Sequence, residues 1–182
     1  MLHYIGSGAV ITFIFEHMKL IELTADKNYN YKDFILQGLK AHPDAFRISV
    51  RDEQREPFPT LGNSYSFTLG ALDELDNLTG VVSFKIETAN REKLAHKGLL
   101  FRMYVAAPHS GKGIGKKLVE KLITRVKQLP DIEQINLTVI ATNSNAIGLY
   151  KSFGFETFSL ERQAIKSNDY YLDECTMVLF LR

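Results

Sequence analysis

From residue 103 to residue 115 the chain reads Met103-Tyr104-Val105-Ala106-Ala107-Pro108-His109-Ser110-Gly111-Lys112-Gly113-Ile114-Gly115. An apolar strand ends near Val105, glycines follow at alternate positions, and a lysine-led apolar helix begins near Lys116. Glycine lets the backbone turn tightly with its amide groups facing inward, and the first turn of a helix adds partial positive charge. The stretch predicts a backbone cradle for a phosphate group. A glycine-rich turn without a ligand is the alternative, because short glycine motifs recur by chance.

Two common nucleotide-binding motifs fit this turn poorly. A Walker loop requires Ser or Thr after Gly-Lys, whereas Gly115 is followed by two lysines with no hydroxyl to reach magnesium. The dinucleotide fingerprint requires two residues between its second and third glycines, whereas only Ile114 separates Gly113 from Gly115. The sequence therefore disfavours kinase, ATPase and NAD-binding functions.

Composition is that of an ordinary globular protein. The chain has 182 residues, of which 45% are hydrophobic and 24% are charged, and this amount of chain forms one domain with a full-sized core. The 22 Lys and Arg residues are balanced by 21 Asp and Glu residues, so no overall basic field favours a nucleic acid partner. We expect a single domain over residues 18–182.

The N-terminal residues 1–17 form an extension of uncertain status. Their apolar run, Gly8 to Phe15, is far shorter than the ~20 residues of a membrane-spanning helix, and no Lys or Arg precedes it as in a secretory signal. We therefore expect no membrane association. The single cysteine, Cys175, cannot form an internal disulfide, which fits a reducing, cytoplasmic location.

Hydrophobic periodicity predicts alternating strands and helices. Period-2 patterns and turn residues indicate strands at 19–23, 64–72, 80–86, 98–105, 135–140, 156–165 and 171–181. Helical spacing indicates helices at 31–40, 49–55, 116–129 and 144–152. A strand-to-helix crossover implies a parallel pair, and the flanking hairpins imply antiparallel pairs. The predicted fold class is α/β, with a mixed, largely antiparallel sheet of about seven strands and helices on both faces.

A second motif follows the glycine turn, and its separation from that turn matters for the comparison below. It reads Asn143-Ser144-Asn145-Ala146-Ile147-Gly148-Leu149-Tyr150-Lys151-Ser152-Phe153-Gly154-Phe155. The two motifs in this order resemble the signature motifs of the GCN5-related N-acetyltransferase (GNAT) family. The close resemblance spans about residues 80–160, and the strand order extends it over residues 18–182. It implies a single-domain fold in which two central strands splay apart.

The resemblance also implies acetyl-CoA as the acetyl donor, lying where the strand that ends at Val105 splays from the strand that ends at Ile140. The backbone of residues 103–105 would pair with the pantetheine, and the amides of the glycine turn would hold the diphosphate. The residues implied in cofactor binding are Met103, Tyr104, Val105, Ser110, Gly111, Lys112, Gly113, Ile114, Gly115, Lys116, Asn143, Ala146 and Tyr150. Ser110 departs from the Arg or Gln usual in the family, which puts the affinity for the cofactor in doubt.

Three residues are candidates for the chemistry. A backbone N–H near Val105, freed by a bulge in the strand, resembles the family's oxyanion donor. Tyr150 matches the tyrosine that protonates the departing thiolate, although its helical spacing also fits core packing. An alkylamine has a pKa near ~10.4 and requires a base. Glu87, at a strand end, is the first candidate for that base, and Asp173 and Glu174 are alternatives that could also attract a cationic amine.

These observations predict an acetyl-CoA-dependent N-acetyltransferase in which a primary amine attacks directly in a ternary complex. The acceptor is left open between a small-molecule amine and a protein amine, and a homodimer is also left open. We predict no metal, because no histidine has a metal-ligand spacing to another histidine or to Cys175. The alternative is a non-catalytic module that binds or senses acyl-CoA.

Overall fold

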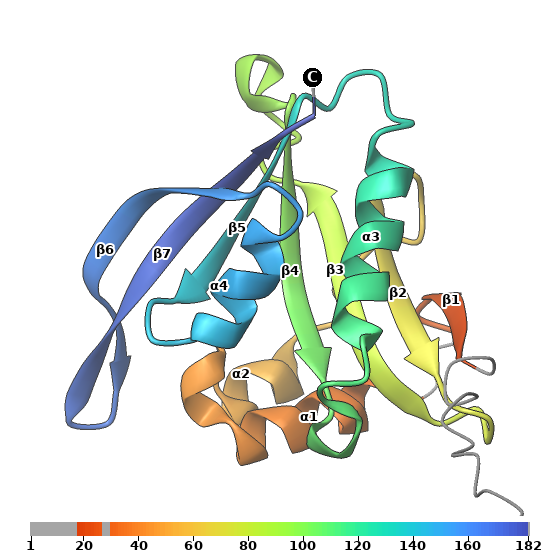
Figure 1. Cartoon of the computed structure of the whole chain (residues 1–182), viewed down its shortest axis with the longest axis vertical. Coiled ribbons are helices and arrows are strands. Elements are labelled where there is room, and N and C mark those ends of the chain that lie inside the picture. The colour runs from red at the N-terminus through yellow and green to blue at the C-terminus, as the bar shows by residue number, and fades with distance from the viewer. Residues whose placement is uncertain (1–17, 27–29, 182) are drawn as a thin grey trace, which may run out of the picture.

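The structure is a computed structural model that describes residues 18–26 and 30–181. The expected extension, residues 1–17, lies outside the described residues. The described residues form a sheet whose strands follow the order β1-β2-β3-β4-β5-β7-β6 (Figure 1). The strands are β1 (Lys19–Leu23), β2 (Ser66–Leu72), β3 (Leu78–Ile86), β4 (Lys97–Val105), β5 (Gln134–Ile140), β6 (Glu156–Ser167) and β7 (Tyr170–Phe180). The prediction of a mixed, largely antiparallel sheet is confirmed.

The centre of the sheet opens between β4 and β5. These strands pair in parallel only where Lys97 to Leu99 face Gln134 to Asn136. The remaining residues of β4, up to Val105, have no partner on β5 in the described pairing, whereas β3 follows β4 as far as Val105 and β7 follows β5 as far as Ile140. The expected central splay is therefore present, open toward the carboxyl ends of β4 and β5.

Four α-helices and three short 3-10 turns connect the described strands. The helices are α1 (Tyr31–Ala41), α2 (Val50–Arg55), α3 (Ile114–Val126) and α4 (Ser144–Lys151), and the turns are η1 (Pro43–Ala45), η2 (Glu92–Leu94) and η3 (Ala107–His109). Neighbouring residues of β3 show that both faces of the sheet are covered. Val82 belongs to the main core with α3, while Val81 belongs to a second cluster with α1. Figure 1 shows α3 and α4 on the face opposite α1 and α2.

The observed ends of the elements differ from the predicted ends by a few residues, each for a local reason. Helix α3 begins at Ile114 rather than Lys116, because Gly113 already has a φ of 76° and acts as its N-cap. It ends at Val126 rather than Leu129, whose amide closes a turn onto the Val126 carbonyl at 2.9 Å. The β6–β7 hairpin is longer than predicted, because Asn168 takes a left-handed φ of 51° and allows a tight turn.

Helix α2 begins with a capping box. The Ser49 hydroxyl accepts a hydrogen bond from the Asp52 amide, and the Asp52 carboxylate accepts one from the Ser49 amide at 2.9 Å. These two bonds satisfy amide groups that a helix start otherwise leaves free. The backbone N–H of Ser49, and after it the Ser49 hydroxyl, which donates to the same carboxylate at 2.7 Å, hold the pKa of Asp52 below its usual value.

We expect Asp52→Asn to lower the melting temperature by about 2–4 °C at neutral pH. The depressed pKa of Asp52 means that its carboxylate stabilises the fold at neutral pH and that this contribution is lost as the pH falls through the folded-state pKa. The difference between variant and wild type should therefore shrink in acid. Thermal melts at pH 7 and pH 3 measure it, with Asp33→Asn in the first turn of α1 as control. A difference that persists unchanged at pH 3 would contradict this account.

Candidate active site

The glycine turn forms an open loop at the end of β4. Gly111 and Gly113 have φ values of 75° and 76°, in the left-handed region that glycine adopts at little cost. The first helical hydrogen bond of α3 runs from the Lys117 amide to the Gly113 carbonyl at 3.1 Å. The amides of residues 114–116 precede that bond, and a helix start leaves such amides free for a ligand. This backbone geometry is compatible with the predicted phosphate cradle.

Two predicted cradle residues have roles that the sequence did not indicate. The Ser110 amide donates to the Ala107 carbonyl at 3.1 Å within the turn that follows η3, so only its side chain is left to meet a phosphate. Gly115 lets α3 approach β4, because a Cβ built there would lie 3.1 Å from the Cε of Met103. Lys112 and Lys116 are exposed, as surface cations beside the turn would be.

The splayed part of β4 presents different side chains to the two faces. Met103 and Val105 pack against the main core on the side of α3, where Leu149 of α4 also lies. Tyr104 points to the opposite face, where its ring meets Phe34 at 5.2 Å and Phe46 at 5.6 Å. The edge of β4 between these faces keeps its backbone groups free on the side of β5, as an added strand requires.

The bulge of β4 lies earlier in the strand than we expected. Val81 faces Tyr104 and Ser83 faces Phe101, so Arg102 and Met103 together oppose the single residue Val82. Val105 itself lies in register with Gly80. The backbone irregularity that could free an oxyanion donor is therefore at residues 102–103 rather than beside Val105, because an extra residue is accommodated where Arg102 takes a φ of 51°.

Tyr150 lies in the last turn of α4 and packs in the main core. Its ring is almost fully buried and packs edge-to-face with the ring of Phe155, which follows α4, with the two ring centroids 5.7 Å apart. Burial strongly raises the pKa of the Tyr150 hydroxyl. The hydroxyl therefore stays protonated across the neutral range, which is the state that an acid requires.

Asn143 is the N-cap of α4. Its side-chain oxygen accepts a hydrogen bond from the Ala146 amide at 3.1 Å. The side-chain nitrogen of Asn143 can still donate a hydrogen bond to a ligand. Asn143 and Ala146 thus stand at the first turn of α4, the helix that follows the carboxyl end of β5.

Glu87 lies at the closed end of the sheet. Its amide donates to the Lys97 carbonyl at 2.9 Å, and its carboxylate accepts from the Asn136 side chain at 2.7 Å. Lys97 begins β4, whereas the cradle follows the last residue of β4, so at ~3.3 Å per residue the two ends lie roughly 26 Å apart. This geometry gives Glu87 a structural partner and weakens its case as the base.

Glu174 lies instead at the open end of the splay. It faces Ile140, the last residue of β5, and its side chain is almost fully buried. Its Oε1 atom has no hydrogen-bond partner, although the exposed Arg47 places its Nε 3.2 Å away. Asp173, the other alternative, accepts a hydrogen bond from the Gln163 amide at 2.8 Å and is thereby tied to β6.

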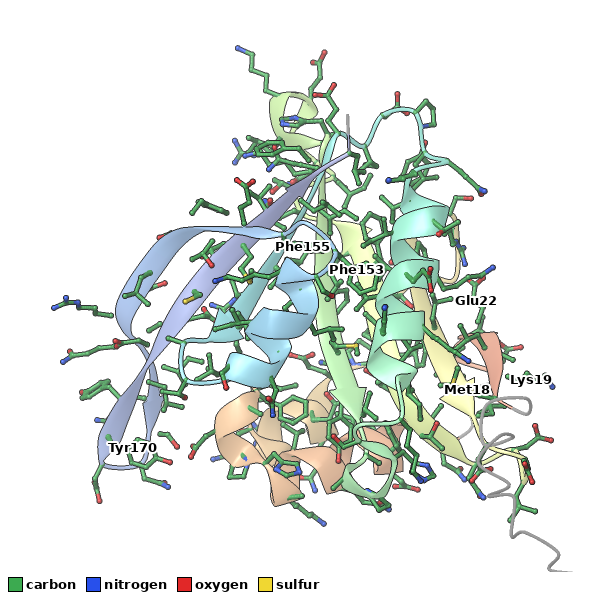
Figure 2. All side chains as sticks on the ribbon, in the orientation of Figure 1. Met18, Lys19, Glu22, Phe153, Phe155 and Tyr170 are labelled. Carbon is green, nitrogen blue, oxygen red and sulfur yellow. The ribbon has the colours of Figure 1, made fainter. Side chains whose placement is uncertain are left out.

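The α1–α2 connection covers this end of the sheet on the face of Tyr104. Arg47 comes from this connection, and Asp44 in η1 accepts hydrogen bonds from the Tyr170 hydroxyl at 2.6 Å and the Ser167 hydroxyl at 2.9 Å. Tyr170 stands at the tip of the β6–β7 hairpin (Figure 2). The connection and the hairpin together form the wall beside Glu174.

Sequence reasoning missed a buried ionic cluster at the bulge. Arg102 forms ion pairs with Glu53 of α2 and with Glu56, the residue that follows α2, and its guanidinium lies 3.5 Å from the Tyr31 hydroxyl of α1. Glu53 is completely buried. Burial, as the largest cause, raises the pKa of Tyr31 to about 12. The available signal was a single arginine inside the otherwise apolar run from Leu99 to Val105.

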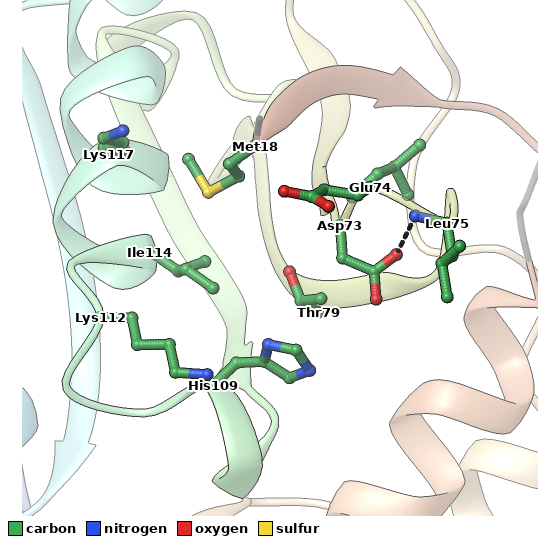
Figure 3. Close-up of a pocket in the computed structure, with 10 residues that line it drawn as sticks. Met18, Asp73, Glu74, Leu75, Thr79, His109, Lys112, Ile114 and Lys117 are labelled. Carbon is green, nitrogen blue, oxygen red and sulfur yellow. Dashed lines mark hydrogen bonds between the residues drawn. The ribbon is translucent and has the colours of Figure 1, made fainter. Parts of the chain in front are cut away.

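A pocket of about 340 Å³ lies beside the cradle, on the side of α3 that faces the β2–β3 turn (Figure 3). Acidic residues of the β2–β3 turn line one side of the pocket, and basic residues at and after the glycine turn line the other. Within the β2–β3 turn, Asp73 accepts a hydrogen bond from the Leu75 amide at 2.9 Å. The lining residues are Met18, Leu72, Asp73, Glu74, Leu75, Thr79, His109, Lys112, Ile114 and Lys117. Figure 1 shows α4 beyond the other side of α3, so this pocket is separate from the splay.

No group of three or more His, Cys, Asp and Glu side chains among residues 18–26 and 30–181 could hold a metal ion. Every helix in the same ranges is too short or too polar to span a bilayer.

Comparison with known proteins agrees with this geometry. The model of the acetyltransferase (GNAT) family matches residues 31–155, more than half of the chain. The chain therefore belongs to the GNAT family, as the two sequence motifs predicted.

Two curated relatives and two solved structures illustrate the similarity. Probable spermine N(1)-acetyltransferase and spermine/spermidine N(1)-acetyltransferase from two Bacillus subtilis strains are each 37% identical over 57 residues, which is 31% of this chain. That match spans only 38% of the relatives' own length.

The solved structures cover nearly the whole fold. A GNAT-family acetyltransferase from Streptococcus pneumoniae has a TM-score of 0.75 at 17% identity, covering 90% of this chain and 98% of that one. The protein yncA from Salmonella typhimurium, solved with its cofactor acetyl-CoA, has a TM-score of 0.74 at 19% identity, covering 92% and 95%. At these identities the likeness shows the shared fold.

Proposed function

We propose that this protein transfers an acetyl group from acetyl-CoA to a primary amine by direct attack in a ternary complex. The observation that carries the proposal is the row of free backbone amides at residues 114–116, placed at the open end of the β4–β5 splay. Such amides bind a diphosphate, and the adjoining free edge of β4 offers hydrogen bonds to an extended pantetheine. Acetyl-CoA supplies an activated thioester.

The cofactor side of the site is built from the residues that the sequence singled out. Gly111 and Gly113 give the turn its shape, and Lys112 and Lys116 add positive charge around it. The bulge at residues 102–103 offers a backbone N–H to the oxygen on which negative charge develops during attack. Val105 is retained as part of the strand edge that pairs with the pantetheine.

Glu174 is the base that the geometry favours. It lies on β7 opposite the last residue of β5, beside the wall formed by the α1–α2 connection and the β6–β7 hairpin. Its carboxylate, whose Oε1 lies 3.2 Å from Nε of the exposed Arg47, can receive a proton from the attacking ammonium. The nitrogen then uses its lone pair to form the bond to the acetyl carbon as the bond to sulfur breaks. Tyr150 supplies a proton to the departing thiolate. The nitrogen loses its second proton as the amide forms, and that proton restores the Tyr150 hydroxyl, so that the net change is one proton gained by Glu174.

A cationic small amine is the acceptor to test first. The curated Bacillus subtilis relatives are named for spermine. The almost fully buried carboxylate of Glu174 would also favour the binding of a cationic ammonium group. A protein amine is the second class. A cytoplasmic location and a homodimer stay predictions of the sequence.

The experiment is a thiol-release screen with acetyl-CoA against pooled amines, including spermine, amino acid derivatives and peptides with free N-termini. Release that depends on one pool supports the transferase and narrows its acceptor. Calorimetry with acetyl-CoA in the absence of amine tests the cradle separately. Tight binding without thiol release for any pool, and no effect of Tyr150→Phe, would instead support the acyl-CoA sensor.

Tyr150→Phe is expected to lower kcat about 100-fold while the dissociation constant for CoA changes less than about threefold, because only the proton transfer is lost. Burial holds the pKa of Tyr150 well above its usual value, so wild-type activity should not fall through tyrosine ionisation up to about pH 10. Steady-state kinetics from pH 6 to 10 measure both. Tyr65→Phe, which removes a hydroxyl bonded to Asp131, is the control. An unchanged kcat in Tyr150→Phe would leave Tyr150 as a core aromatic only.

A further inference from the structure

The bulge of β4 changes which side chains face each side of the sheet. In a regular strand, residues three apart point to opposite faces. Leu100 and Met103 nevertheless both pack in the main core with α3. The extra residue that makes this possible is Arg102, which has a φ of 51° and directs its side chain to α1 and α2 on the other face. The path of the splayed part of β4 therefore depends on the conformation of Arg102.

Contacts from two helices fix that conformation. The guanidinium of Arg102 pairs with Glu53 in α2 and with Glu56 immediately after the helix. The Tyr31 hydroxyl of α1 lies 3.5 Å from the same guanidinium, and Lys32 lies 3.8 Å from the second oxygen of Glu53. A left-handed arginine persists only where its surroundings hold it. These contacts provide that support.

The cluster is buried enough to act as a rigid connection. The side chain of Arg102 is 10% exposed and that of Glu53 is 0% exposed. Without Arg102 the Glu53 carboxylate would be buried without its close ion-pair partner, which disfavours any arrangement that separates the two. A forked guanidinium also fixes orientation as well as distance, which a lysine ammonium does not.

We propose that Arg102 is a positioning residue, whose pairing with Glu53 locks the β4 bulge so that its backbone N–H groups stay available to the thioester carbonyl oxygen. This inference rests on the proposed function, because the bulge matters in this way only if the thioester lies in the splay. The Arg102–Glu53 pair also links α2 to β4, the strand along which acetyl-CoA is proposed to lie. Arg102 touches neither substrate in this account.

The test compares two ligands that differ at the carbonyl. Acetyl-CoA carries the oxygen, while S-ethyl-CoA, a thioether, lacks it. Wild-type protein should bind acetyl-CoA about tenfold more tightly, as one net hydrogen bond allows. In Glu53→Gln and Arg102→Lys this ratio should fall to about one, while the dissociation constant of CoA itself changes less than about threefold. The kcat should fall about 30-fold with little change in the KM for acetyl-CoA.

Matched variants separate positioning from stability. Glu22→Gln breaks the surface pair between β1 and Arg125 of α3 and should leave the ratio as in wild type. Glu56→Gln alters the half-exposed partner of Arg102 and should lower the affinity ratio of acetyl-CoA to S-ethyl-CoA only in part. This variant tests the proposal if Glu53→Gln fails to fold. Thermal melts confirm folding.

The outcomes distinguish this inference from the function on which it rests. A wild-type ratio of one, or a ratio retained in folded Glu53→Gln and Glu56→Gln, overturns the positioning role even if thiol release is normal. Loss of CoA affinity in proportion to the melting temperature would reduce the cluster to a structural support. Absence of both CoA binding and thiol release in the wild type would instead overturn the proposed function.

Discussion

Gly113→Glu is expected to weaken acetyl-CoA binding, and with it turnover, at least about 100-fold. Gly113 has a φ of 76° and immediately precedes the first residue of α3. A side chain there must adopt a left-handed backbone, which costs ~1–2 kcal/mol, and a carboxylate would stand where the cradle is to hold a diphosphate. A total loss of about 2.7 kcal/mol corresponds to 100-fold in affinity. Calorimetry with acetyl-CoA and the thiol-release rate measure the two effects.

Gly62→Glu is the matched control. Gly62 has a φ of 67°, so the substitution requires the same left-handed backbone and adds the same charge in the loop before β2. A Cβ there would approach the Thr24 methyl at 3.3 Å, which calls for a small adjustment. This variant should lose stability but keep cofactor affinity. Full activity in Gly113→Glu, or an equal loss of affinity in both variants, would contradict the proposal that the glycine turn binds the cofactor.

The sequence was informative where function depends on local backbone geometry. Glycine at 111 and 113 is nearly required by a left-handed φ, and Asn143 at the start of a helical pattern indicates an N-cap. Both motifs could therefore be recognised without knowledge of the rest of the fold. The fold class followed from the same local patterns, since a strand, a crossover helix and a parallel strand imply the central pair β4 and β5.

Long-range register could not be obtained in that way. β7 inserts between β5 and β6, so the strand that follows β5 in sequence is not its neighbour in the sheet. Only this insertion brings Glu174 opposite Ile140, at the open end of the splay. Glu87 ends a strand just as plainly in the sequence, but β3 and β4 run antiparallel, which carries it to the closed end. Local patterns do not contain that distinction.

The bulge at Arg102 illustrates a second limit. Arginine has no intrinsic preference for a left-handed φ, so nothing in its own residue type signals the irregularity. The conformation is stabilised by Glu53, 49 residues earlier in the chain, through a contact that forms only when α2 packs on the sheet. A bulge expected beside Val105 is therefore found at residues 102–103.

Glu174→Gln is expected to lower kcat/KM for the amine about 100-fold and to leave the KM for acetyl-CoA unchanged. Glutamine has the same shape but cannot accept a proton, and removal of a general base costs at least about 10²-fold. Arg47, the ion-pair partner of Glu174, is 60% exposed and can turn to water, so stability should change little. A thermal melt checks this.

The pH dependence of the same variant identifies the reason for the loss. Without a base, attack requires amine that is already neutral. For an alkylamine of pKa near ~10.4, the neutral fraction increases about tenfold for each unit by which the pH is raised, as long as the pH stays below the pKa. The rate of Glu174→Gln should therefore climb toward the wild-type rate as the pH rises from 7 to 9.5. Glu161→Gln, on the exposed strand β6 opposite Glu174, removes a carboxylate from the same row and should behave as wild type. If Glu87→Gln produced the loss and the pH-dependent recovery while Glu174→Gln did not, the base would lie at the closed end of the sheet, and the acceptor would have to enter from the side of Asn136.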